Sequence, residues 1–164
     1  MINNQTALLV IDVQKGLAEA ANFNSLIAKI NQRIKSYREK DQPIIFMQHT
    51  DAELPYGSPA WMLAAKLAVQ NEDQIFLKYH SDSFFETGLQ NYLTNRQINQ
   101  LEICGLQTEY CVDTAIRVGH HLGFKIKVLS GLHTTFDTPL LSAAAAIKYH
   151  EDIWNNSFAK VVQR

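Results

Sequence analysis

The stretch LEICGLQTEYCVDT, residues 101–114, decides how this 164-residue chain folds. It reads as an apolar strand that passes through Gly105 into a helix, with Cys111 near the start of that helix. A strand that leads into a helix is half of a β-α-β unit, the building block of parallel sheets. A thiol at a helix start lies near the positive end of the helix dipole and near unpaired backbone N–H groups, which suits a nucleophile. The position equally suits a cysteine that only fills apolar space, because cysteine is among the most buried residue types.

The rest of the chain repeats this alternation of strand and helix. Continuous apolar runs are typical of strands covered on both faces, and we expect such strands at residues 6–12, 43–49, 73–78, 101–106 and 124–129, with an edge strand at 158–162. Apolar residues at helical spacing predict helices at 23–40, 61–69, 85–95, 112–122 and 139–154, and Asp137 or Thr138 can cap the last of these. Right-handed crossovers then give an α/β fold, a three-layer, Rossmann-like αβα arrangement with a six-stranded parallel sheet, in a single domain over residues 1–164.

Composition excludes several classes of partner. The 15 basic and 16 acidic side chains nearly cancel and form no basic stripe, so we expect a small-molecule substrate and no nucleic acid. The apolar runs are too short to span a bilayer and the N-terminus does not resemble a signal peptide, which indicates a cytoplasmic protein without a membrane partner. The two cysteines suit a reducing compartment, with Cys104 expected in the core. No glycine-rich nucleotide-binding motif occurs, and we expect no cofactor.

Three chemically capable residues fall at the same edge of the predicted sheet. Asp12 ends the first strand, Lys78 ends the third, and Cys111 follows the fourth. Taken singly, Asp12 could be a turn residue and Lys78 a solvent-exposed strand end. Because parallel strands gather their carboxyl ends at one crevice, the three together indicate an acid, a base and a nucleophile for covalent acyl transfer.

The segments around these residues resemble the isochorismatase-like cysteine hydrolases, a superfamily that includes nicotinamidases, N-carbamoylsarcosine amidase and streptothricin hydrolase-like enzymes. The resemblance is carried by LLVIDVQKG (8–16), FLKYHSDSFFETGL (76–89) and ICGLQTEYCVDTAIRVGHHLGFKIKVLSG (103–131). It implies a catalytic triad in which Asp12 accepts the thiol proton, Lys78 stabilises the thiolate, and Cys111 attacks a carbonyl carbon. It further implies oxyanion donors at the backbone N–H groups of Tyr110 and Cys111, and a cis peptide between Gln107 and Thr108.

The departures from the family concern the substrate more than the chemistry. Metal-dependent nicotinamidases carry Asp-x-His after the second strand, whereas this chain has Gln48-His49-Thr50-Asp51, and His49 alone is a weak ligand, so we expect no metal. Where the family often has Asp-Ala after the fifth strand, this chain has Gly131-Leu132. Residues expected on or near the crevice loops give the candidate pocket walls: Leu17, His49, Trp61, Tyr79, Phe84, Tyr110, His133 and Phe136.

The resemblance predicts a metal-independent cysteine hydrolase that cleaves the C–N bond of a small amide, cyclic amide or carbamoyl compound through a thioester on Cys111. A first alternative is an isochorismate-type vinyl ether hydrolase, in which water and Asp12 do the chemistry. A second is a redox-sensing or binding protein that uses Cys111 without hydrolysis. The exposed aromatics could also mark a subunit contact, and the family leads us to expect a homo-oligomer, either a dimer or a tetramer.

Overall fold

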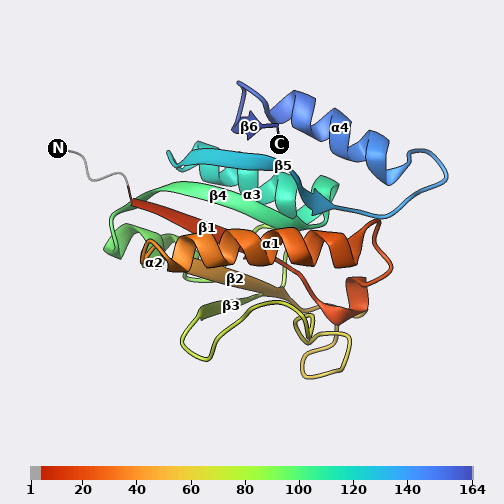
Figure 1. Cartoon of the computed structure of the whole chain (residues 1–164), viewed down its shortest axis with the longest axis horizontal. Coiled ribbons are helices and arrows are strands. Elements are labelled where there is room, and N and C mark those ends of the chain that lie inside the picture. The colour runs from red at the N-terminus through yellow and green to blue at the C-terminus, as the bar shows by residue number, and fades with distance from the viewer. Residues whose placement is uncertain (1–4, 164) are drawn as a thin grey trace.

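One parallel sheet forms the centre of the computed structural model, which describes residues 5–163 (Figure 1). Neighbouring strands are parallel throughout, and the order across the sheet is β3-β2-β1-β4-β5-β6. The strands are β1 (Gln5–Ile11), β2 (Ile44–His49), β3 (Gln74–Lys78), β4 (Ile98–Leu106), β5 (Lys125–Thr134) and β6 (Lys160–Val162). The predicted six-stranded α/β fold is therefore confirmed, while residues 1–4 and 164 of the expected domain lie outside the described residues.

Helices cover both faces of this sheet. The helices are α1 (Phe23–Arg38), α2 (Leu89–Asn95), α3 (Asp113–His121) and α4 (Ala143–Trp154), with a 3-10 turn at Lys15–Leu17 and a π-helical turn, η2, at Thr108–Val112. Helix α1 lies across one face in Figure 1, and α2 and α3 pack on the other. None of the helices between residues 5 and 163 combines the length and the apolar character that a bilayer crossing requires.

Two apolar layers separate the sheet from its helices. In β1, Leu8 and Val10 point toward α1, and Leu9 and Ile11 point toward α2 and α3. All four side chains are at most 1% exposed, and fully burying a side chain of this kind contributes about 1.5–3 kcal/mol. The sequence of β1 is continuously apolar because β1 is a central strand with no face exposed to solvent, as predicted.

The segment between β2 and β3 is not helical, contrary to the prediction for residues 61–69. Its backbone is held by side chains of other elements. The carbonyl of Trp61 accepts hydrogen bonds from the amides of Gln14 at 2.7 Å and Gln48 at 3.0 Å, and the N–H of Ala68 donates to Asn31 Oδ1 at 2.9 Å. These tertiary bonds take up groups that a helix would use internally, and they override the local propensity.

Two helices begin four residues later than predicted, and strand β4 begins three residues earlier, at Ile98. Helix α2 begins at Leu89 instead of residue 85, because Gly88 precedes it with φ +79°. The final helix begins at Ala143, where Ser142 caps it and Asp137 Oδ1 accepts the Ala143 N–H at 2.7 Å. The predicted cap at Asp137 or Thr138 is therefore wrong, because Ser142 takes that position, although Asp137 still accepts a backbone N–H of the first turn.

Strand β5 extends five residues beyond the predicted end at residue 129. The pairing between β4 and β5 shifts register between Ile103 and Gly105 and then continues, with Gly105 opposite His133 and Leu106 opposite Thr134. Residues 130–134, expected in a loop beside the crevice, are therefore strand residues. This moves His133 from the predicted pocket wall into the sheet.

Gly105 permits the close approach of β4 and β1 where the strand order reverses. Its φ is +119°, and a Cβ at this position would lie 2.0 Å from the carbonyl oxygen of Ile11. The chain leaves β1 toward the face covered by α1 and leaves β4 toward the face covered by α3, and such a switch point is where open parallel sheets bind ligands. Gly105 thus places the segment that carries Cys111 directly beside the end of β1.

We predict that Gly105→Ala destabilises the protein by at least about 3 kcal/mol, because the methyl group meets backbone atoms that cannot move without separating the strands. Gly57→Ala is the matched control. Gly57 has φ +77° and no atom within 4 Å of the added Cβ, so its substitution should cost only the left-handed backbone strain of about 1–2 kcal/mol. Urea unfolding of both variants gives the comparison, and equal losses at the two sites would contradict the close-contact argument.

Candidate active site

The three predicted catalytic side chains meet at the carboxyl edge of the sheet. The Nζ of Lys78 lies 2.8 Å from Asp12 Oδ2 and 3.1 Å from Cys111 Sγ. All three residues are buried, with exposed fractions of 2% for Asp12, 1% for Lys78 and 8% for Cys111. Asp12, Lys78 and Cys111 therefore form one cluster, an arrangement consistent with a catalytic triad.

Sheet register and local backbone set the positions of these side chains. Asp12 directly follows β1 with φ +50°, a left-handed conformation that Asp tolerates better than most residues, and its N–H donates to the Met47 carbonyl at 3.1 Å. Lys78 is the last residue of β3 and lies opposite His49 in the pairing with β2. Cys111 is in η2, so the predicted nucleophile lies within a π-helical turn before α3 begins.

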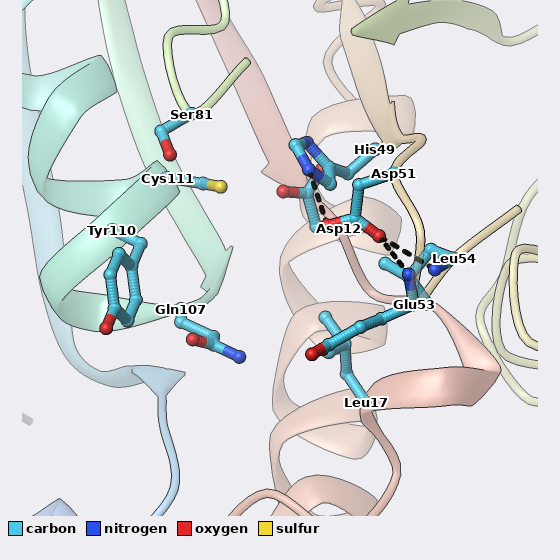
Figure 2. A pocket seen from close by; sticks show the side chains of 10 residues that line it. All are labelled: Asp12, Leu17, His49, Asp51, Glu53, Leu54, Ser81, Gln107, Tyr110 and Cys111. Atoms are coloured by element: carbon cyan, nitrogen blue, oxygen red, sulfur yellow. Dashed lines mark hydrogen bonds and ion pairs between the residues drawn. The ribbon is translucent and has the colours of Figure 1, made fainter. Parts of the chain in front are cut away.

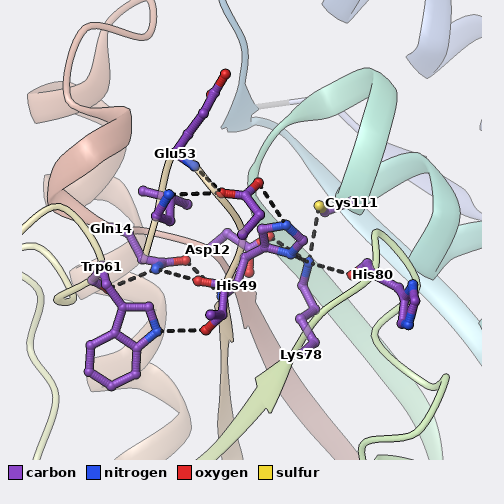
Figure 3. A network of polar contacts seen from close by, with 11 residues as sticks. Asp12, Gln14, His49, Glu53, Trp61, Lys78, His80 and Cys111 are labelled. Atoms are coloured by element: carbon purple, nitrogen blue, oxygen red, sulfur yellow. Dashed lines mark hydrogen bonds and ion pairs between the residues drawn. The ribbon is translucent and has the colours of Figure 1, made fainter. Parts of the chain in front are cut away.

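The Lys78 ammonium lies at the centre of four acceptors (Figure 3). Besides Asp12 and Cys111, it contacts His49 Nδ1 at 3.0 Å and the His80 carbonyl at 3.1 Å. An ammonium has only three protons, so it cannot donate to all four acceptors at once. A neutral thiol is the weakest acceptor of the four, and Lys78 can satisfy the other three while Cys111 carries its own proton.

His49 is held as a neutral acceptor by its two contacts. Its Nδ1 faces the Lys78 ammonium, which has no lone pair, so we assign the ring proton to Nε2, 3.1 Å from Asp51 Oδ2. Asp51 also accepts the N–H groups of Glu53 and Leu54, both at 2.8 Å. Burial alone would raise the pKa of Asp51, but these backbone bonds lower it below its usual value, so the carboxylate is charged at neutral pH.

Burial determines the protonation of the triad. It raises the pKa of Asp12 above its ordinary value in spite of the opposing charge of Lys78. Burial, followed by the negative charge of Asp12, raises the pKa of Cys111 to about 12. Burial alone would lower the pKa of Lys78, but the negative charge of Asp12 raises it above its ordinary value. The resting site is therefore an Asp12–Lys78 ion pair beside a neutral thiol, and the thiolate expected from the helix start is not preformed.

A cavity of about 300 Å³ opens above this cluster (Figure 2). Cys111, Tyr110 and Gln107 lie on one side of it, and Asp12, His49 and the loop after β2 lie on the other. Of the predicted pocket walls, Leu17, His49 and Tyr110 line the cavity. The pocket residues that sequence reasoning missed are Asp51, Glu53, Leu54 and Ser81. All four follow the carboxyl ends of β2 or β3, and this position along the chain is the only feature of the sequence that indicates a place on the cavity wall.

Five predicted pocket residues are not among those that line the cavity: Trp61, Tyr79, Phe84, His133 and Phe136. Trp61 donates its indole N–H to Thr50 Oγ1 at 2.9 Å, and Phe84 stacks on Phe124 in the core. Phe136 packs on the α1 layer, and Tyr79 is 62% exposed. The expected homo-oligomer, in which exposed aromatics would be buried, stays a prediction.

His133 belongs to a buried chain of contacts behind the nucleophile. Its Nδ1 lies 2.9 Å from Thr108 Oγ1 and its Nε2 lies 3.1 Å from Glu151 Oε1, which ties β5 to η2 and to α4. The Glu151 carboxylate also accepts a hydrogen bond from Ser130 at 3.0 Å. Burial alone would raise the pKa of Glu151, but the bonds to His133 and Ser130 lower it. These contacts anchor the first residue of η2 and leave Cys111 free to face the cavity.

The cis peptide lies one position earlier than predicted. It joins Leu106 to Gln107, and the bond between Gln107 and Thr108 is not cis. One of the two expected oxyanion donors is also occupied, because the Tyr110 N–H donates to the Gln107 carbonyl at 3.1 Å. Gln107 itself lines the cavity, as does Cys111, whose backbone N–H stays a predicted oxyanion donor.

Ligand atoms of Asp12, His49 and Cys111 lie within 4.8 Å of one another, close enough to hold a metal ion. However, the Lys78 ammonium contacts all three of these side chains, at 2.8, 3.0 and 3.1 Å. A divalent cation at the centre of this set would meet a positive charge at contact distance, so the donor set suits the ammonium better than a metal.

Comparison with known proteins agrees with the fold. The Isochorismatase domain model matches residues 6–163. The chain belongs to the isochorismatase family. A crystal structure of an isochorismatase family protein superposes with a TM-score of 0.94 at 40% identity, covering 99% of each chain. The nicotinamidase of Staphylococcus aureus superposes with a TM-score of 0.83 at 26% identity, covering 97% of this chain and 98% of that one. A streptothricin hydrolase of Streptomyces noursei is 26% identical to this chain. The matched region covers 81% of this chain and 51% of the streptothricin hydrolase.

We predict that Lys78→Met destabilises the protein by about 3–5 kcal/mol at neutral pH, because it leaves the Asp12 carboxylate buried without a counter-ion. Loss of Lys78 raises the pKa of Asp12 further in the folded state, so the folded form binds more protons and the deficit should shrink as pH falls. The double variant Asp12→Asn/Lys78→Met should unfold at a higher urea concentration than Lys78→Met alone. A double variant that is less stable than the single one would show that the buried pair is not the cause.

We also predict that Asp12→Asn makes Cys111 more reactive toward iodoacetamide, since the Asp12 charge is, after burial, the main reason for the high pKa of this thiol. Each unit of lowered pKa increases the thiolate fraction tenfold at a fixed pH below the pKa, so alkylation at pH 8 should be at least about tenfold faster than in the wild type. Cys111→Ala gives the background from Cys104. Equal or slower alkylation in Asp12→Asn would refute the assigned electrostatics.

Proposed function

We propose that this protein is a metal-independent cysteine amidohydrolase that cleaves the C–N bond of a small amide, cyclic amide or carbamoyl compound through a thioester on Cys111. The observation that carries the proposal is the position of one ammonium between a carboxylate and a thiol. Moving the proton from Cys111 to Asp12 exchanges the carboxylate–ammonium pair for a thiolate–ammonium pair without changing the net charge of the buried site. The transfer therefore avoids the large cost of creating a new charge in a buried environment.

The reaction proceeds in two halves. In the first, the Cys111 proton passes to Asp12, the sulfur bonds to the substrate carbonyl carbon, and the oxyanion is received by the Cys111 backbone N–H. The C–N bond then breaks, and the departing nitrogen takes the proton from Asp12. In the second half, Asp12 accepts a proton from a water molecule that attacks the thioester, and the proton returns to the sulfur when the acid leaves.

The cavity and the relatives favour a small amide. A cavity of about 300 Å³ is at the lower end of the range for small-molecule sites. One relative is named for hydrolysis of nicotinamide and another for hydrolysis of streptothricin. Amide hydrolysis needs a nucleophile, a proton shuttle and a stabilised oxyanion, and Cys111, Asp12 and the backbone of η2 can supply them.

The structure gives less support to the redox alternative. A redox-sensing thiol needs a low pKa and commonly a second cysteine to resolve it. Burial raises the pKa of Cys111, and Cys104 is in the apolar layer on the opposite face of the sheet. The vinyl ether alternative leaves Cys111 without a chemical role, although its sulfur lines the cavity beside Asp12.

We predict that Cys111→Ala lowers amide hydrolysis by at least about 10³-fold, because no other thiol lines the cavity among residues 5–163. The measurement is ammonia release over a panel of small amides, lactams and carbamoyl compounds, with intact mass spectrometry to detect the acyl-enzyme. Cys104→Ala, which removes the thiol in the opposite layer, is the control and should remain active. Hydrolysis that survives in Cys111→Ala would refute covalent catalysis, and if it acted on a vinyl ether it would favour the alternative reaction.

A further inference from the structure

The walls of the cavity carry an unbalanced negative charge. Three of the lining residues, Asp12, Asp51 and Glu53, are carboxylic acids, and no lysine or arginine lines this cavity among residues 5–163. Glu53 is exposed, and in Figure 2 its side chain extends into the gap between Leu17 and Gln107. A small molecule that reaches Cys111 must pass these groups.

Two of these charges remain after internal pairing. The Lys78 ammonium, whose side chain is 0% exposed, balances Asp12 at 2.8 Å. His49 does not balance Asp51, because the contact of its Nδ1 with Lys78 keeps the imidazole neutral. The side chain of Glu53 makes no ion pair with any described residue. The cavity therefore presents Asp51 and Glu53 as two uncompensated negative charges.

Two further features of the cavity suit a ligand that donates hydrogen bonds and carries positive charge. Asp12 is 2% exposed and lines the cavity, and its Oδ1 has no hydrogen-bond partner among the described residues. A buried carboxylate oxygen without a partner is costly, and an N–H donor from a bound ligand would satisfy it. On the opposite wall, the ring of Tyr110 is 57% exposed and offers an aromatic face of the kind that attracts cations.

We infer that this cavity selects small amides or lactams that carry a positive charge, such as an ammonium or amidinium group, and rejects those that carry a carboxylate. The inference rests on the proposed amide hydrolysis for its reaction, but the charge preference of the cavity is a separate property. The substrate cation lies between Glu53 and Asp51 and against Tyr110, and the carbonyl group lies over Cys111. This arrangement determines which molecules reach the nucleophile, whereas the triad determines what happens to them.

The charge preference can be measured without any substrate, because Cys111 reports the local potential. Methanethiosulfonate reagents of similar size that carry an ethyltrimethylammonium or an ethylsulfonate group modify thiols. The sulfur of the protein attacks the sulfenyl sulfur, a disulfide forms, and methanesulfinate leaves. The preference is the rate of modification of Cys111 by the cationic reagent divided by the rate for the anionic reagent. This ratio is normalised by the same ratio for free 2-mercaptoethanol. Peptide mass mapping assigns the modification to Cys111 rather than Cys104.

We predict a normalised preference of about fivefold or more for the cationic reagent in the wild type at low salt, and a smaller preference at 0.5 M salt. Glu53→Gln should reduce the preference and Glu53→Lys should reverse it, a total change of about tenfold. Glu72→Lys is the matched control. Glu72 is also exposed, but it precedes the amino end of β3, whereas the cavity lies at the carboxyl ends of the strands. A preference for the anionic reagent in the wild type, as a lysine beside a cysteine would suggest, overturns the inference. An equal change of the normalised preference in Glu53→Lys and Glu72→Lys also overturns the inference.

Turnover separates this inference from the proposed function. Trimethylammonioacetamide and 3,3-dimethylbutanamide have the same shape and differ in one positive charge. The ratio of kcat/KM for the cationic amide to kcat/KM for the neutral amide should fall about tenfold from the wild type to Glu53→Lys and stay unchanged in Glu72→Lys. Comparing this ratio between variants cancels the intrinsic reactivity of each amide. If the thiol reagents show the preference but no amide in the panel is hydrolysed, the proposed function fails and the charge selection stands. If amides are hydrolysed but Glu53→Lys changes neither ratio, the charge selection is wrong and the hydrolase stands.

Discussion

The buried ammonium of Lys78 is the interaction on which the site depends. Leaving such a group unpaired in the interior costs several kcal/mol, so its acceptors must be placed accurately. They come from the ends of β1 and β2, from the loop after β3 and from η2, because Asp12, His49, the His80 carbonyl and the Cys111 sulfur all lie within 3.1 Å of Nζ. The parallel sheet brings these segments to one edge, and Gly105 allows β4 to approach β1 closely enough to complete the set.

The same geometry explains how a thiol with a high pKa can be the nucleophile of the proposed reaction. A thiolate held permanently beside Lys78 would compete with Asp12 for the ammonium, and burial disfavours a second negative charge in the cluster. The neutral thiol avoids that competition, and in the proposed mechanism its proton moves to Asp12, whose own pKa is raised by burial. His49 contacts Lys78 separately from the thiol, and its bond to Asp51 holds the ring in the accepting tautomer.

The sequence predicted those parts of the molecule that depend on local pattern and strand order. Continuous apolar runs indicated the parallel sheet, and the positions of Asp12 and Lys78 at strand ends, together with Cys111 after the fourth strand, brought the triad to one edge. What failed depended on contacts between distant segments. Residues 61–69 are held by Gln14 and Gln48 side chains, and β5 continues because its register shifts opposite Gly105. His133 looked like a loop residue for that reason, and no local signal marks its contacts with Thr108 and Glu151.

The proposed catalysis and the inferred charge selection depend on different parts of this fold, which are held in place differently. The triad is attached to strand ends and to η2, which the buried chain from Thr108 through His133 to Glu151 fixes from behind. The carboxylates that face the cavity entrance come from the loop after β2, where Asp51 is fixed by backbone N–H groups while the Glu53 side chain stays exposed. We therefore expect a substitution at Glu53 to change the potential above Cys111 without altering the distances within the Lys78 cluster, so that the inferred charge preference is separable from the proposed chemistry.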